Sequence, residues 1–97
     1  MKHTLENNTL TLFLEGELNS YNSEDVEKET EEIISGIELQ HVVIDMEQLN
    51  YISSAGLRII ARLKQQCDDI ALKRVPEGVF EILEMVGFQN LMTIEKL

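Results

Sequence analysis

The 97-residue chain is poor in the residues that cross-link, stiffen or positively charge a protein. It holds one cysteine, one proline and no tryptophan, and 8 Lys and Arg stand against 18 Asp and Glu. The single cysteine, Cys67, excludes an internal disulfide. The net charge of -10 argues against binding nucleic acid or an anionic membrane, because both require clustered cations. We therefore expect proteins or small molecules as partners.

The chain also lacks a charged-then-apolar leader, a long apolar span and a Pro/Gly/Ser-rich linker. A cytoplasmic location without membrane insertion is the expectation from these absences and from the cysteine content. The hydrophobic fraction of 43% is ordinary for a folded protein despite the charge. Because a chain of this length builds one core of modest size, the sequence predicts a single domain over residues 1–97.

Patterns for catalysis are missing as well. His3 and His41 fall on separate predicted strands with no pattern that would pair them as metal ligands. The glycines are scattered singly, so there is no phosphate-binding loop. Ser54-Ala55-Gly56 lacks the preceding glycine of a nucleophile elbow. We predict no catalytic residue, no metal and no cofactor, and hence a binding protein rather than an enzyme.

Hydrophobic patterning gives the first half of the fold. Residues 2–6 and 9–14 read as two strands joined by Asn7-Asn8, a pair that tolerates the positive φ of a hairpin turn. Ser20, Asn22 and Ser23 are candidate caps of a helix whose apolar positions are Val26, Thr30, Ile33, Ile34 and Ile37. Residues 41–46 are continuously apolar at their centre, which predicts a strand covered on both faces in the middle of the sheet.

The second half alternates in the same way. In chain order we expect a link over 47–52, a helix from Ser53 or Ser54 to about Gln66, a strand over 70–75, a helix opened by Pro76 and ended by Gly87, and a strand over 91–94. The predicted order is β-β-α-β-α-β-α-β, an α/β fold in which helices pack on a mixed sheet of about five strands. Met46, Met85, Met92 and Cys67 are expected in the core.

Two hydroxyls mark the segment from Asp45 to Arg58. There a buried strand ends, a link crosses the sheet edge, and Ser53 and Ser54 arrive where a helix begins. The first turn of a helix has unpaired N–H groups and a partial positive charge, so a serine there can cap the helix and a phosphate on it would find donors. On residue chemistry alone, simple capping and a regulatory role both remain open.

This segment resembles the signature of the STAS family, the bacterial anti-sigma factor antagonists, in which a buried strand leads into Asp-Ser-x-Gly-Leu at a helix start. The corresponding residues here are Ser53-Ser54-Ala55-Gly56-Leu57. Gly16-Glu17-Leu18-Asn19 is similar to the Gly-Glu-Leu-Asp turn of the family. The predicted element order agrees along nearly the whole chain, although STAS domains commonly add a terminal helix that we do not predict here.

The resemblance implies an exchange of partners controlled by a phosphate. A STAS antagonist binds an anti-sigma factor that is also a serine kinase, frees the sigma factor, and is then phosphorylated; a serine phosphatase reverses the modification. The kinase, not this chain, holds ATP and magnesium. Carried over by position, Ser54 is the phosphate acceptor, and the partner-binding set is Asn19, Ser53, Ser54, Ala55, Gly56, Leu57 and Arg58.

Two other functions are compatible with the sequence. One is a STAS scaffold that binds its partner constitutively within a larger sensor or transport complex, with Ser54 only capping the helix; Asn19 and Ser53, where the family has carboxylates, favour it. The other is a small-ligand site or enzyme around Asp45, Asn19 and Ser54.

Two arginines of the predicted central helix have several possible partners. Arg58 and Arg62 could pair with neighbouring acids, with carboxylates of a partner, or with a phosphate near Ser54.

Overall fold

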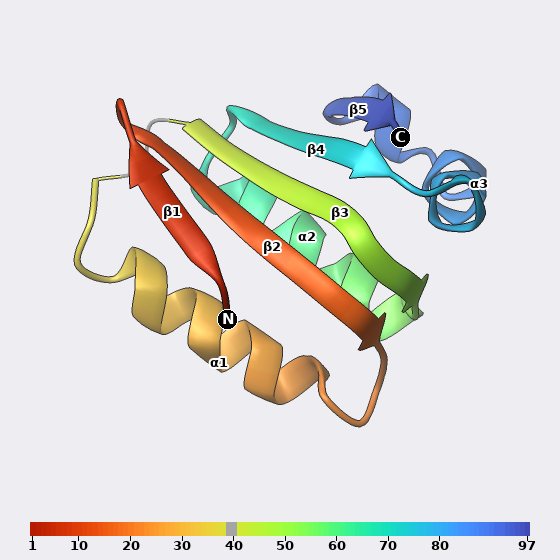
Figure 1. The fold of residues 1–97 in the computed structure, drawn as a ribbon, viewed down its shortest axis with the longest axis horizontal. Helices are drawn as coiled ribbons and strands as arrows, with labels where there is room; N and C mark the ends of the chain where they lie inside the picture. Colours follow the sequence, from red (N-terminus) through yellow and green to blue (C-terminus); the bar gives the residue numbers. More distant parts are fainter. Residues whose placement is uncertain (39–40) are drawn as a thin grey trace.

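Strands and helices alternate along the chain in the computed structural model, which describes residues 1–38 and 41–97 (Figure 1). The elements are β1 (His3–Glu6), β2 (Thr9–Leu18), α1 (Ser23–Ile34), β3 (His41–Ile52), α2 (Ser54–Gln66), β4 (Ile70–Val75), α3 (Glu77–Met85), the 3-10 helix η1 (Phe88–Asn90) and β5 (Thr93–Lys96). The predicted order of strands and α-helices is confirmed, with η1 as an addition.

The strands form one mixed sheet in the order β1-β2-β3-β4-β5. β1 runs antiparallel to β2, and the other neighbours are parallel. Asn7 and Asn8 make the hairpin turn with φ values of 51° and 64°, as their side chains permit. The α/β fold with a five-stranded mixed sheet is therefore confirmed.

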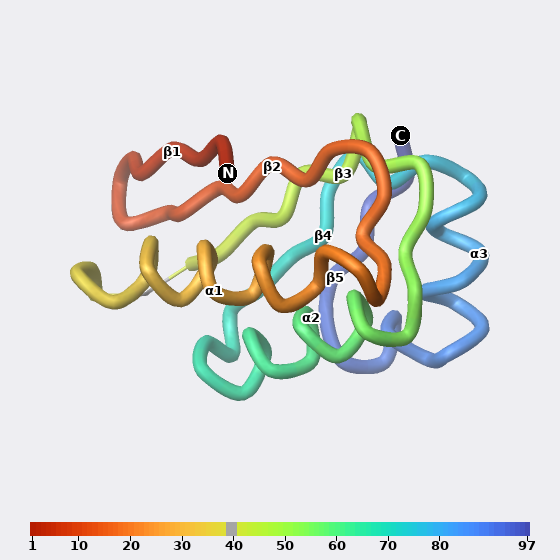
Figure 2. The backbone as a smooth tube through the Cα atoms, turned by 90° about the horizontal axis from the view of Figure 1, so that it is seen from below, coloured from red at the N-terminus to blue at the C-terminus, as the bar shows by residue number. Residues whose placement is uncertain are grey.

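Helices α1 and α2 lie side by side under one face of the sheet, and α3 lies on the opposite side of the molecule from β1 (Figures 1 and 2). Period-2 alternation turns Leu10, Leu12 and Leu14 of β2 into the core, and Val42, Ile44 and Met46 of β3 follow the same rule. All the buried apolar residues form one cluster. Across residues 1–38 and 41–97, no helix has both the length and the apolar character needed to span a bilayer.

The other face of the sheet carries no helix within the described residues (Figure 2). Phe13 is half-buried there, with the Lys2 ammonium 5.0 Å from its ring centre. Arg74 donates from Nε to Asp45 at 2.8 Å and lies 3.2 Å from a carboxylate oxygen of Glu47. The hydrogen bond to Asp45 raises the pKa of Arg74 above its already high ordinary value.

Two strands are longer than predicted. β2 continues beyond residue 14 to Leu18, and residues 47–52, predicted as a link, belong to β3. The sequence did not predict these extensions because the pairing of the two strands contains two register shifts, at which β3 carries extra residues relative to β2. Because of these bulges Met46, Leu49 and Ile52 are buried at a spacing of three, which hides the period of two that signals a strand.

The third helix and the last strand differ from prediction in detail. Pro76 is the N-cap of α3 in extended conformation, and the helix begins at Glu77. Gly87 ends the helical segment as predicted, with φ of 82°. Residues 91–94 were expected to be a strand, but η1 delays β5 to Thr93. Met85 was expected in the core and is 83% exposed, because it lies on the outer face of α3.

Candidate functional site

The candidate site forms where β2 and β3 end together. Leu18 pairs with Ile52 at the carboxyl ends of these parallel strands, and the Ser53 backbone N–H donates to the Leu18 carbonyl at 2.8 Å. The turn that follows β2 and the first turn of α2 therefore emerge at the same edge of the sheet (Figure 1). This placement brings the segments around Asn19 and Ser54, distant in sequence, onto one surface.

Ser53 caps α2. Its backbone is extended, with φ of -96° and ψ of 175°, and its side chain accepts a hydrogen bond from the Gly56 N–H at 3.4 Å. Its carbonyl accepts from the Leu57 N–H at 2.9 Å. These contacts are those of an N-cap residue, so the capping role considered for Ser54 belongs to its neighbour.

Ser54 is the first residue of α2, and its side chain is exposed. In the described part of the chain its hydroxyl takes part in no hydrogen bond. The hydroxyl therefore has no structural partner to give up. It stands at the positive end of the helix dipole, where an attached phosphate is tolerated electrostatically.

Gly56 allows α2 to approach the strand ends closely. A Cβ at this position would lie 2.7 Å from Cγ of Leu18 and 2.8 Å from Cγ1 of Ile52. Such distances are far inside van der Waals contact, so a side chain here would push the helix away from the sheet. Glycine thus fixes the height of the Ser54 backbone above the ends of β2 and β3.

Asn19 organises the turn after β2. Its Oδ1 accepts from the N–H groups of Tyr21 at 2.9 Å and Asn22 at 3.2 Å. Asn22 in return accepts from the Asn19 N–H at 2.9 Å, and its Nδ2 donates to the Glu17 carbonyl at 2.7 Å. This reciprocal pair leaves Tyr21 projecting, 95% exposed. Sequence reasoning missed Asn22 as a partner of Asn19 and missed Tyr21; the Asn-x-x-Asn spacing was the available signal.

The remaining predicted partner-binding residues divide between core and surface. Leu57 is half-buried against the hydrophobic core, while Arg58 is exposed. Arg58 and Ala55 line a hollow of about 200 Å³ between α1 and α2. In that hollow Arg62 donates to both carboxylate oxygens of Glu27 at 2.7 Å. Arg62 therefore forms an ion pair with a neighbouring acid of the same chain, one of the roles considered for it.

Asp45 does not belong to this surface. It lies seven residues before the end of β3, roughly 20 Å of strand from Ile52, and pairs with Arg74 on the open face of the sheet. The alternative of a small-ligand site or enzyme that unites Asp45 with Asn19 and Ser54 in one cleft is therefore not supported, because Asp45 lies apart from the other two. The physical reason is the extension of β3 through the residues predicted to be a link.

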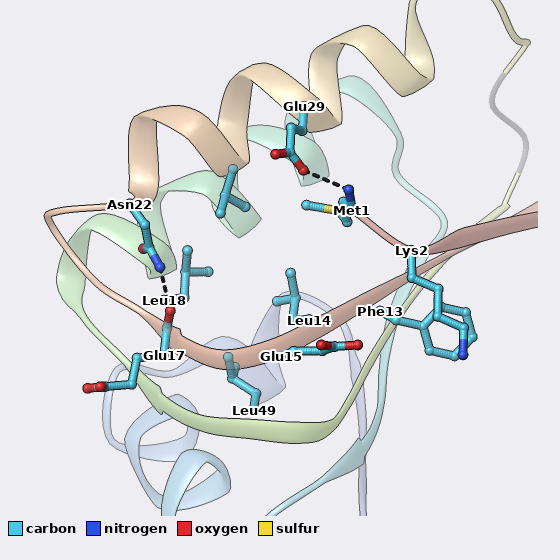
Figure 3. A pocket seen from close by; sticks show the side chains of 11 residues that line it. Met1, Lys2, Phe13, Leu14, Glu15, Glu17, Leu18, Asn22, Glu29 and Leu49 are labelled. Carbon is cyan, nitrogen blue, oxygen red and sulfur yellow. Dashed lines mark hydrogen bonds and ion pairs between the residues drawn. The ribbon is translucent and has the colours of Figure 1, made fainter.

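A second hollow lies between β2 and α1 (Figure 3). It has a volume of about 200 Å³ and an apolar floor that includes Leu14, Leu18 and Leu49. At its rim the Met1 amino group lies 2.8 Å from a carboxylate oxygen of Glu29. Its polar lining consists of Lys2, Asn22 and the carboxylates of Glu15, Glu17 and Glu29, and within the described residues no Ser, Cys or His lines it.

Metal ligands are not gathered either. Within residues 1–38 and 41–97, no cluster of three or more His, Cys, Asp or Glu side chains is arranged to hold an ion. His3 bonds the Met1 carbonyl at 3.2 Å, whereas His41 pairs with Asp69. The two histidines therefore have separate surroundings.

Comparison with known proteins identifies the family. The family model described as STAS domain matches residues 2–96. The chain belongs to the STAS domain family. A candidate anti-sigma factor antagonist of Bordetella bronchiseptica, BtrV, is 33% identical over 100 residues, covering 97% of this chain and 85% of BtrV. The anti-sigma F factor antagonist of Paenibacillus polymyxa is 28% identical, covering 88% of this chain and 76% of that protein.

Solved structures show the same fold for this STAS domain. A candidate anti-sigma factor antagonist of Thermotoga maritima superposes with a TM-score of 0.86 at 16% identity, covering 99% of this chain and 86% of that one. The anti-sigma factor antagonist SpoIIAA, solved in its unphosphorylated form, gives a TM-score of 0.77 at 17% identity, covering 96% and 87%. The STAS fold is confirmed.

Proposed function

We propose that this STAS domain is an anti-sigma factor antagonist that binds an anti-sigma factor with serine kinase activity, and that phosphorylation of Ser54 ends the binding. The observation that carries the proposal is the division of labour between two adjacent serines. Ser53 caps α2, while Ser54 beside it is exposed and has no hydrogen bond among the described residues. A modification at Ser54 therefore alters the surface without disturbing the helix start.

The sequence relatives support the same function, because proteins named as anti-sigma factor antagonists match nearly the whole chain. The partners we propose are an anti-sigma factor/serine kinase and a serine phosphatase, in the cytoplasm where sigma factors act. The chain contributes the docking surface and the acceptor hydroxyl. ATP and magnesium belong to the kinase in this scheme.

The switch acts on binding rather than on folding. A phosphate on Ser54 adds about -1.5 to -2 charge, and burying an unpaired charge in an interface costs several kcal/mol. Each 1.4 kcal/mol of this cost raises the dissociation constant of the complex about tenfold. The exposed position of Ser54 leaves the phosphate in water in the free domain, so the fold persists.

A constitutive STAS scaffold is the second candidate, and the neutral residues at two family positions favour it. Asn19 and Ser53 keep the acceptor roles that carboxylates could fill, since Asn19 closes the turn after β2 and Ser53 caps α2. They lack the negative charges that a kinase could recognise. Under this alternative the surface around Ser54 binds its partner in an unmodified state at all times.

Intact-mass spectrometry separates the two candidates. The protein is incubated with ATP, magnesium and each serine kinase of its host, and any added phosphate is mapped to a residue. We expect one phosphate on Ser54, none on Ser54→Ala, and unchanged stoichiometry on Ser53→Ala. No phosphate on the unmodified chain, with a control antagonist modified in parallel, would contradict the switch and leave the scaffold.

A further inference from the structure

Arg58 stands one helical turn after Ser54 on α2. Residues four apart on a helix are surface neighbours, and an acidic group that precedes a basic one by four positions is the favourable order. Both side chains are exposed. A phosphate on Ser54 and the guanidinium of Arg58 would therefore meet without any change in the backbone.

Of the two arginines on α2, Arg58 is the one whose guanidinium is available to a phosphate. Arg62, the next arginine along α2, already donates to both oxygens of Glu27 on α1. Within the described chain, Arg58 takes part in no ion pair. The acids that face it across the hollow are Glu24 and Glu27 of α1, of which Glu27 is engaged by Arg62 and Glu24 carries a single charge.

We propose that Arg58 is the positioning residue for a phosphate on Ser54, which it holds against the first turn of α2 through a bidentate ion pair. The inference rests on the proposed function, which supplies the phosphate. A guanidinium presents two parallel donors that match two phosphate oxygens, and a phosphate carries about twice the charge of Glu24. The phosphate on the same helix is thus the stronger partner for Arg58.

The pairing gives phosphorylation two effects on the docking surface. It introduces negative charge at Ser54, and it withdraws the exposed cation of Arg58 from whatever carboxylate a partner offers. In the unmodified domain Arg58 is free to point away from the helix into an interface. One modification therefore changes the charge of two neighbouring positions on the same turn of α2.

The test installs phosphoserine at position 54 by genetic encoding, so that no kinase is needed, and follows the phosphate by 31P NMR as a function of pH. Loss of Arg58 removes a cation that favours the dianion, so Arg58→Gln should move the midpoint upward by about 0.3 pH. Arg58→Lys, which keeps the charge without the planar fork, should move it by less. Lys64→Gln removes the same charge from the far end of α2 and is the matched control.

An upward shift in Arg58→Gln that clearly exceeds the shift in Lys64→Gln supports the ion pair. Equal shifts in the two variants would reduce Arg58 to a contributor of net charge and overturn the proposal. Should Arg58→Gln fail to fold by circular dichroism, Arg58→Met, which also removes the charge, is compared with Lys64→Gln in its place, and equal shifts there would overturn the proposal as well. Absence of Ser54 modification by any host kinase is a separate result that bears on the proposed function alone.

Discussion

At the scale of single residues, two adjacent serines with the same side chain have different physical roles. The hydroxyl of Ser53 is a hydrogen-bond acceptor inside the first turn of α2, whereas that of Ser54 is exposed. The sequence alone could place a serine cap near this position but could not choose between the two. The choice depends on which residue has extended backbone angles, and this follows from how β3 ends.

Ser53→Ala should lower the free energy of unfolding by about 1 kcal/mol, because the Gly56 N–H loses its side-chain acceptor. Ser54→Ala removes a hydroxyl that has no hydrogen bond among the described residues, so it should stay within about 0.5 kcal/mol of the parent. Urea denaturation of the two variants checks this. A larger loss in Ser54→Ala than in Ser53→Ala would show that the cap is assigned to the wrong serine.

Gly56→Ala should lower the free energy of unfolding by about 1–3 kcal/mol, because its Cβ would overlap Leu18 and Ile52. Gly78→Ala on α3 is the matched control, since a Cβ there meets nothing within 4 Å. Replacing that helical glycine should instead stabilise the protein by about 0.4–1 kcal/mol. Thermal and urea unfolding of both variants provide the comparison, and equal effects of the same sign would refute the close approach at Gly56.

At the scale of elements, the sequence predicts what has a simple period and misses what bulges conceal. The continuous apolar run of β3 and the i, i+3, i+4 pattern of α1 were sufficient to place both elements. The carboxyl ends of β2 and β3 were not predicted, because Gly16 has φ of 68° and the register shifts there interrupt the alternation. The candidate site lies beyond these bulges, so its surface could be inferred only through the family resemblance.

The end of β4 contains a second irregularity, at Arg74. This residue has φ of 53°, a value that glycine adopts readily and other residues rarely. Its ion pairs with Asp45 and Glu47 on the open sheet face accompany the left-handed backbone. A bulge between Leu72 and Val75 is what places Arg74 in this conformation.

Arg74→Gly and Arg74→Ala separate the backbone from the side chain. Both variants lose the ion pairs, but only alanine retains a Cβ in the left-handed region. We expect a higher urea midpoint for Arg74→Gly than for Arg74→Ala. The reverse order would mean that residue 74 relaxes to negative φ once its ion pairs are removed.

At the scale of the whole molecule, negative charge dominates. The chain has 18 acidic and 8 basic side chains, for a net charge of -10. Ion pairs such as Arg62–Glu27 and Lys73–Glu95 occupy basic side chains that this sum already includes, so the excess of ten negative charges remains. Self-repulsion of this kind destabilises a compact state and also steers the protein towards basic partner surfaces.

Salt should therefore stabilise the protein. Raising the ionic strength from about 0.01 to 0.15 M shortens the Debye length from about 30 to about 8 Å, which screens repulsion across the domain. Isolated surface ion pairs lose little by comparison, because their contribution is small. We expect a higher melting temperature in NaCl and an equal rise in KCl. A fall on adding either salt would show that attractive pairs outweigh the net charge.

The central claim is that one covalent change at Ser54 controls docking while the fold is retained. Its most direct test is the dissociation constant for the host kinase that modifies the chain, measured for the unmodified and the Ser54-phosphorylated protein with circular dichroism on both. The account predicts at least tenfold weaker binding by the phosphorylated form, as about 1.4 kcal/mol of interface penalty requires, with identical spectra. Equal affinity of the two folded forms would contradict it.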